Sequence, residues 1–124
     1  MNIVLWVVQA LLALAFAGAG LMKLTSERKV LVDRGMGWAE HYSGGAVKLI
    51  GAVEVLGAIG LVLPAALGIA PVLTPIAAAG LALVMAGAVV DHVRRDDAKG
   101  AVPALVLGVL SLFVAVARFG PWAF

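Results

Sequence analysis

The sequence contains no cysteine among its 124 residues. This absence excludes disulfide bonds, thiolate metal sites, iron–sulfur clusters and cysteine nucleophiles. Any redox or hydrolytic chemistry of this protein would therefore use other side chains or a bound molecule.

Charged residues are also scarce, at 13% of the chain, whereas 64% of the residues are hydrophobic and the mean hydropathy is +1.12. A soluble domain usually has about 25% charged residues. The chain has too little polar surface to cover a globule in water, so we expect a membrane protein surrounded by the lipid bilayer. Its net charge of +2 is better explained by membrane topology than by nucleic acid, and we expect no nucleic-acid partner.

Long apolar runs are abundant, and a membrane-spanning helix needs about 20 such residues. The runs predict an all-α protein, an integral membrane four-helix bundle that forms one domain over residues 1–124. The predicted helices cover about residues 3–23, 46–64, 71–91 and 101–118, with an interfacial loop at 24–45.

The basic residues are distributed unevenly between the two ends of the predicted bundle. Eight of the nine lie in or beside the first and third loops, and Arg118 lies at the opposite end. Because basic residues favour the cytoplasmic side of a membrane, both loops are predicted to be cytoplasmic and both termini non-cytoplasmic.

One acidic residue, Glu54, lies inside the second apolar run, in "GAVEVLGAIGLVLP" (residues 51–64). A carboxylate in a membrane is costly unless it is paired, protonated or turned into the bundle. Helical side chains lean toward the N-terminus of their helix, so Lys23 at the end of the first run converges on the depth of Glu54. We predict a Lys23–Glu54 ion pair, with a purely structural role and a functional role equally open.

Other polar residues occur near the predicted helix ends. Asp91 and His92 end the third run, where they either join Lys23 and Glu54 in one polar cluster or lie at the water surface. Gln9 is predicted to form a hydrogen bond between helices. A metal site would require histidines to converge with a carboxylate, which the spacing does not demand, and we expect none.

Four segments resemble the DoxX-like family over nearly the whole chain: "FAGAGLMKL" (16–24), "LIGAVEVLGAIGLVLP" (49–64), "AGLALVMAGAVVDHVRRDD" (79–97) and "ARFG" (117–120). The resemblance implies a small four-helix protein of the bacterial inner membrane. It also implies quinone-linked redox chemistry, because the family is named after a subunit of a thiosulfate:quinone oxidoreductase. The absence of cysteine from this chain argues against the sulfur chemistry that the family name suggests. The family pattern assigns no catalytic role to the residues that it shares with this chain, which are Gly20, Lys23, Gly51, Glu54, Gly57, Gly60 and Pro64.

Two functional hypotheses follow. The first is a protein that binds a lipid-like or quinone-like molecule in an interior pocket, as a homodimer or as a subunit of a redox-linked membrane complex, with any cofactor left open. Its predicted ligand-binding residues are Lys23, Glu54, Gly57, Gly20 and His92. The alternative is a membrane-embedded isomerase, cyclase or epoxide hydrolase that uses Glu54 and Asp91 as general acid and base. A scaffold without a ligand is a third reading, and whether the protein is an enzyme stays open.

Overall fold

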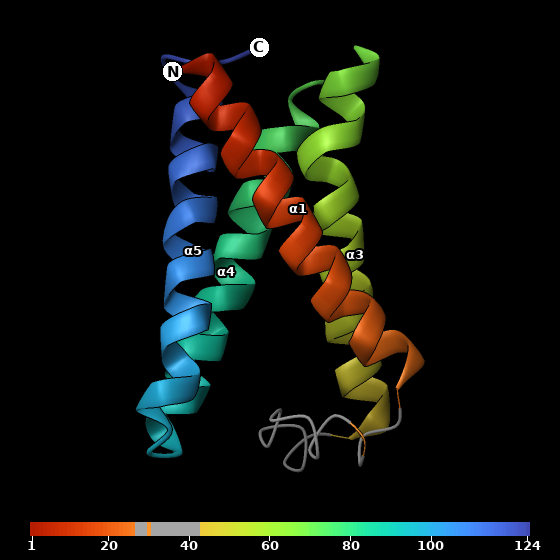
Figure 1. Ribbon diagram of the computed structural model, residues 1–124, viewed down its shortest axis with the longest axis vertical. Helices are drawn as coiled ribbons and strands as arrows, with labels where there is room; N and C mark the ends of the chain where they lie inside the picture. The colour runs from red at the N-terminus through yellow and green to blue at the C-terminus, as the bar shows by residue number, and fades with distance from the viewer. Residues whose placement is uncertain (27–29, 31–42) are drawn as a thin grey trace.

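The computed structural model describes residues 1–26, 30 and 43–124. In these residues the chain forms four long helices, α1 (Asn2–Thr25), α3 (Gly44–Leu67), α4 (Leu73–Arg94) and α5 (Ala98–Phe119) (Figure 1). Each is long and apolar enough to cross a membrane. The all-α fold with four potential spanning helices is confirmed. Most of the predicted interfacial loop 24–45 lies outside the described residues.

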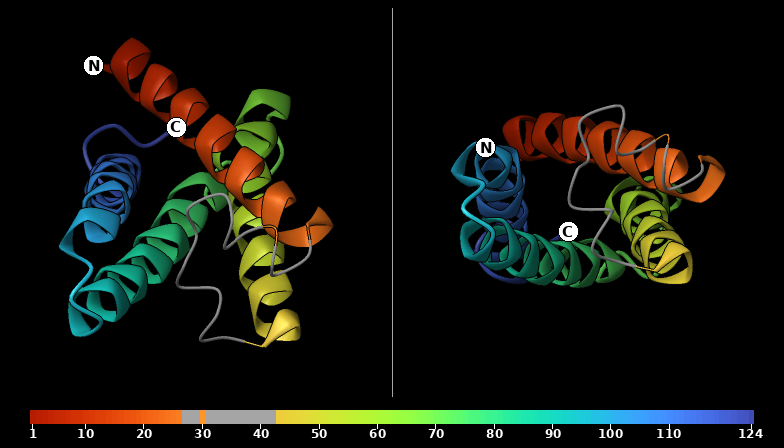
Figure 2. Two further views of the ribbon diagram at one scale, coloured as in Figure 1. Left: turned by 60° about the horizontal axis from the view of Figure 1, so that its bottom comes forward. Right: turned by 90° about the horizontal axis from the view of Figure 1, so that it is seen from below.

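The helices are arranged as two pairs that meet at one end of the molecule. α1 packs along α3 and α4 packs along α5, while α3 contacts α4 less extensively and α1 contacts α5 least. The two pairs diverge toward the end that carries the α4–α5 turn, as Figures 1 and 2 show. Both termini lie at the opposite, closed end (Figure 1). Which of these ends faces the cytoplasm stays a prediction.

Two glycines let α1 and α3 approach each other closely. A Cβ atom built on Gly20 would lie 2.6 Å from the carbonyl oxygen of Gly51, and one built on Gly51 would lie 2.7 Å from that of Gly20. In lipid no hydrophobic effect drives helices together, and small residues at such contacts let the backbones approach and gain van der Waals attraction. At this point the α1–α3 pair is therefore held by direct contact between the two helix backbones.

Pro64 lies inside α3 and leaves a carbonyl group without its helical donor. Because proline has no N–H, the carbonyl of Gly60 loses the usual bond from four residues later. The hydroxyl of Thr74 on α4 donates to Gly60 O at 3.3 Å and to Leu61 O at 3.2 Å, and Gln9 Nε2 on α1 donates to Leu61 O at 2.7 Å. Three helices are thus joined at one turn, and the interhelical hydrogen bond predicted for Gln9 is confirmed.

These bonds allow α3 to continue past Pro64, where the sequence suggested that it would stop. The helix ends at Leu67, and Gly68 follows with a left-handed φ of 69°. Glycine carries no Cβ penalty in that conformation, which is why it commonly ends helices.

The outer surface of the bundle is as apolar as its core. Leu5, Leu12, Phe16, Leu61 and Leu81 are almost completely buried, yet many other leucine, valine and isoleucine side chains are exposed on the outside of the helices. A water-soluble bundle would place charged residues there. The distribution fits a bundle whose outer surface contacts lipid.

Candidate functional site

Lys23 and Glu54 form the predicted ion pair. The Nζ atom of Lys23, in the last turn of α1, donates to Oε1 of Glu54 on α3. Their side chains are 8% and 2% exposed, respectively. The two opposite charges offset each other's cost of burial in lipid.

The surroundings of this pair are filled by the protein itself. The close contact of Gly20 with Gly51 lies beside it, and a Cβ atom on Gly51 would lie 2.8 Å from Cβ of Lys23. Gly57, which the sequence placed in a pocket wall, faces the side chain of Leu81, with atoms 2.7 Å from the position of a Cβ. The geometry around Lys23, Glu54, Gly20 and Gly57 favours a structural contact between helices over a ligand site.

Asp91 and His92 lie elsewhere, at the turn between α4 and α5. Both carboxylate oxygens of Asp91 accept from Nε of Arg95 at 3.1 Å, and Nδ1 of His92 lies 2.9 Å from Oδ2 of Asp97. None of these bonds reaches α1 or α3, and the α4–α5 turn lies on the diverging side of the bundle (Figure 1). The structure therefore does not bring the four polar residues into one cluster.

This separation has a physical origin and a consequence for the enzyme hypothesis. Arg95 follows Asp91 by four residues, the spacing at which helical side chains meet, so the acid pairs locally. The acid–base hypothesis needs Glu54 and Asp91 in one cavity, whereas each forms an ion pair within its own helix pair. Among the described residues, no group of three or more histidine, cysteine or acidic side chains could hold a metal ion.

Asp97 caps the start of α5. Its Oδ1 accepts from the backbone N–H of Gly100 at 3.0 Å and its Oδ2 contacts His92. The Gly100 bond, followed by the bond to His92, holds the pKa of Asp97 below its ordinary value of 3.8. These bonds favour the charged carboxylate, as a cap at a helix N-terminus does.

Acidification is expected to loosen this cap. Because the folded-state pKa of Asp97 is lower than the unfolded-state one, its contribution to stability is full above 3.8 and is lost as the pH falls through the folded-state pKa. The amide resonance of Gly100, followed by NMR against pH, should titrate with a midpoint below 3.8. The transition should vanish in Asp97→Asn and persist in Asp96→Asn, the matched control. A midpoint at or above the ordinary value would contradict the expectation.

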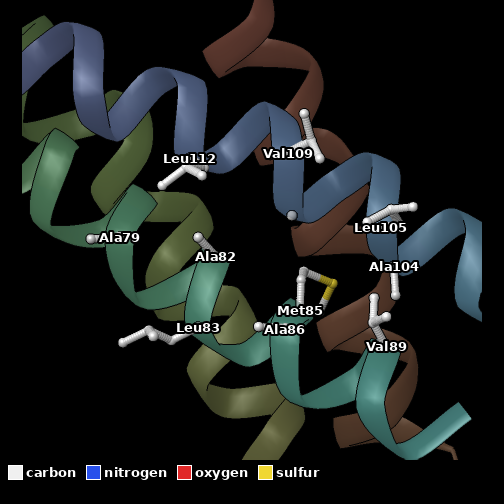
Figure 3. Close-up of a pocket in the computed structure, with 11 residues that line it drawn as sticks. Ala79, Ala82, Leu83, Met85, Ala86, Val89, Ala104, Leu105, Val109 and Leu112 are labelled. Carbon is white, nitrogen blue, oxygen red and sulfur yellow. The ribbon is translucent and has the colours of Figure 1, made fainter. Parts of the chain in front are cut away.

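A groove of about 460 Å³ lies between α4 and α5. We call it the α4–α5 groove. Figure 3 shows side chains of both helices around it. The lining residues are Ala79, Ala82, Leu83, Met85, Ala86, Val89, Ala104, Leu105, Gly108, Val109 and Leu112. Leu83, Leu105 and Val109 are mostly exposed, so the groove opens to the outside of the bundle.

The sequence predicted an interior pocket beside Glu54, a residue of the α1–α3 pair. The groove lies instead between α4 and α5. Its cause is the run of alanines on α4 opposite Gly108 on α5, since small side chains leave the space between the helices unfilled. These alanines belong to the segment "AGLALVMAGAVV" (residues 79–90). Which of the two helix pairs leaves a groove depends on the tertiary arrangement.

A second buried polar group, which the sequence did not reveal as buried, lies at the closed end of the bundle. Arg118, near the end of α5, is only 3% exposed. Its Nε donates to Oε1 of Gln9 at 2.9 Å, and its Nη1 donates to Oδ1 of Asn2 at 2.8 Å and to the carbonyl of Trp122 at 2.9 Å. The sequence placed Arg118 at the membrane boundary and Gln9 between helices, and the two meet there.

Comparisons with known proteins agree with this architecture. The family model described as the DoxX-like family matches residues 7–114, which is most of the chain and includes all of α3 and α4 and most of α1 and α5. Searches of curated proteins and of solved structures found no match. With four apolar helices and a family match of this extent, the chain is a multi-pass membrane protein that belongs to the DoxX-like family.

Proposed function

We propose that this protein binds a lipid-like or quinone-like molecule, whose apolar chain occupies the α4–α5 groove. The observation that carries the proposal is the groove itself, about 460 Å³ and lined by apolar side chains of both helices. Small-molecule sites have volumes of about 300–1,000 Å³ and are lined mostly by apolar residues. The groove opens to the outside of the bundle, so a molecule dissolved in the bilayer reaches it without crossing water.

The polar end of such a molecule fits the α4–α5 turn. His92 follows Val89, a lining residue, by three residues, so the two lie on the same face of α4. The His92–Asp97 pair offers donors and acceptors there, and the side chain of Asp97 is half exposed. In this proposal His92 is the predicted ligand-binding residue that keeps its role. Lys23 and Glu54 hold α1 against α3.

The setting of this function is also a proposal. In this proposal the α4–α5 turn, which is rich in basic residues, faces the cytoplasm from a bacterial inner membrane, in keeping with the preference of basic residues for that side. A bound quinone would support a place in a redox-linked membrane complex, whereas a bound phospholipid or fatty acyl chain would support a lipid-handling role.

Filling the groove tests the proposal. Ala86 lines it and is exposed, so Ala86→Phe adds a ring to the groove without replacing a buried core residue. Ala15→Phe on the exposed side of α1 is the matched control. Native mass spectrometry of the detergent-purified protein, supplied with ubiquinone or phospholipid, should show about tenfold less bound molecule in Ala86→Phe, the effect of losing roughly 1.4 kcal/mol of binding.

Three results are informative. Loss of one class of molecule in Ala86→Phe, with the control unchanged, supports the site and names the class. Equal retention in both variants would place the binding outside the groove. If wild-type protein retains nothing from either supply, the proposal is wrong and the scaffold reading is favoured.

A further inference from the structure

Arg118 places a buried positive charge among neutral groups. The acceptors that it contacts are two side-chain amides and a backbone carbonyl, from Gln9, Asn2 and Trp122. The four acidic side chains in the described ranges lie in the other half of α3 or at the α4–α5 turn, away from this end. They are Glu54, Asp91, Asp96 and Asp97. None of these four acidic side chains is among the acceptors that bond the guanidinium.

One nitrogen of this guanidinium has no acceptor. Nη2 of Arg118 is buried and makes no hydrogen bond within the described structure. Buried donors are nearly always bonded, and a charged donor left without an acceptor is especially costly. An acceptor that is not among the described residues would therefore stabilise this nitrogen.

The cover over the guanidinium is built from two aromatic rings, one on α1 and one after α5. The ring of Phe124 has its centroid 3.9 Å from Cζ of Arg118, and that of Trp6 lies 5.8 Å away. The two rings contact each other at 5.4 Å. Phe124 is about half exposed, so its ring is a peripheral cover that an incoming group can displace.

We propose that Arg118, held by Gln9 and Asn2, binds an anionic phosphate group at the closed end of the bundle. The guanidinium fork matches phosphate oxygens in geometry and charge. Arg118 precedes the last residue of α5, so it lies near the end of a spanning helix, at the level where lipid phosphates are found. The phosphate comes either from a lipid headgroup or from the aqueous phase.

This site is separate from the α4–α5 groove and from the family pattern. Asn2, Arg118 and Trp122 lie outside residues 7–114, the part that the family model matches. Failure of groove binding would leave the Arg118 site untouched, because the two sites share no residue.

The test measures anionic lipid on the full-length protein in detergent micelles. Native mass spectrometry should show phosphatidylglycerol retained in preference to phosphatidylcholine, and Arg118→Gln should weaken that retention about tenfold, as expected for loss of a charge-assisted pair. Arg94→Gln, at the exposed end of α4, is the matched control for general attraction between basic residues and anionic lipid. Equal retention by wild type and Arg118→Gln would overturn the proposal.

Two further measurements identify the source and guard against misfolding. If inorganic phosphate alone raises the melting temperature of wild type but not of Arg118→Gln, the site takes free phosphate; if only phosphatidylglycerol does so, it takes a headgroup. If neither does, the proposal is overturned. Should Arg118→Gln fail to fold, Phe124→Ala decides, because it removes the cover and keeps the charge. Phosphatidylglycerol retention should then rise several-fold, and unchanged retention would contradict the site.

Discussion

Replacing Glu54 with leucine while Lys23 is kept is expected to lower the free energy of unfolding by about 3–5 kcal/mol, the cost of removing one member of a buried ion pair. Both side chains are buried and directly bonded, so the remaining ammonium group has little access to water. Denaturant titration of the purified protein in mixed micelles, followed by circular dichroism, measures this change.

The double variant Lys23→Met/Glu54→Leu is the decisive control. Replacing both members of a buried ion pair by apolar residues of similar volume is often neutral or stabilising. The double variant should therefore recover most of the stability that either single variant loses. If it is as unstable as Glu54→Leu alone, the loss comes from packing and not from an uncompensated charge.

The second large effect is expected from Gly20→Leu, which should disrupt the α1–α3 contact and cost at least about 3 kcal/mol, the upper range for overpacking. A Cβ at this position would lie 2.6 Å from the carbonyl oxygen of Gly51 and 2.7 Å from a methyl group of Val55. The first obstacle is backbone, so no side-chain rotation relieves it, and the helices must separate. Separation would also pull Lys23 away from Glu54.

Gly18→Leu provides the matched control for this prediction. Gly18 lies two residues away on the same helix, and nothing lies within 4 Å of the Cβ position there. The same substitution should therefore leave the denaturant midpoint almost unchanged. Equal destabilisation of the two variants would show that the backbone contact at Gly20 does not set the effect; helix propensity cannot cause it, because leucine forms helices better than glycine.

Much of the fold could be predicted from the sequence because the signals are strong and local. Four apolar runs fix four helices, and a lone carboxylate inside one of them demands a partner, which the lean of helical side chains identified as Lys23. The end of α3 depends on other helices, because the bonds beside Pro64 come from Thr74 on α4 and Gln9 on α1.

The candidate sites depended on information that the sequence does not carry locally. Whether Asp91 meets Glu54 depends on how far the two helix pairs diverge, and Arg95 is a nearer partner one turn away. The burial of Arg118 depends on α1, which is distant in sequence, and on Phe124, which follows α5. The α4–α5 groove likewise depends on how α4 and α5 pack against each other.

The pairing of consecutive helices bears on how the chain enters a membrane. α1 and α3 carry both members of the Lys23–Glu54 pair, so these two helices can enter the bilayer together with the two charges already neutralised. α5 differs, because two of the groups that Arg118 binds, Gln9 and Asn2, belong to α1. α5 is synthesised after α1 and therefore depends on α1, already in the membrane, for a place to bury its arginine.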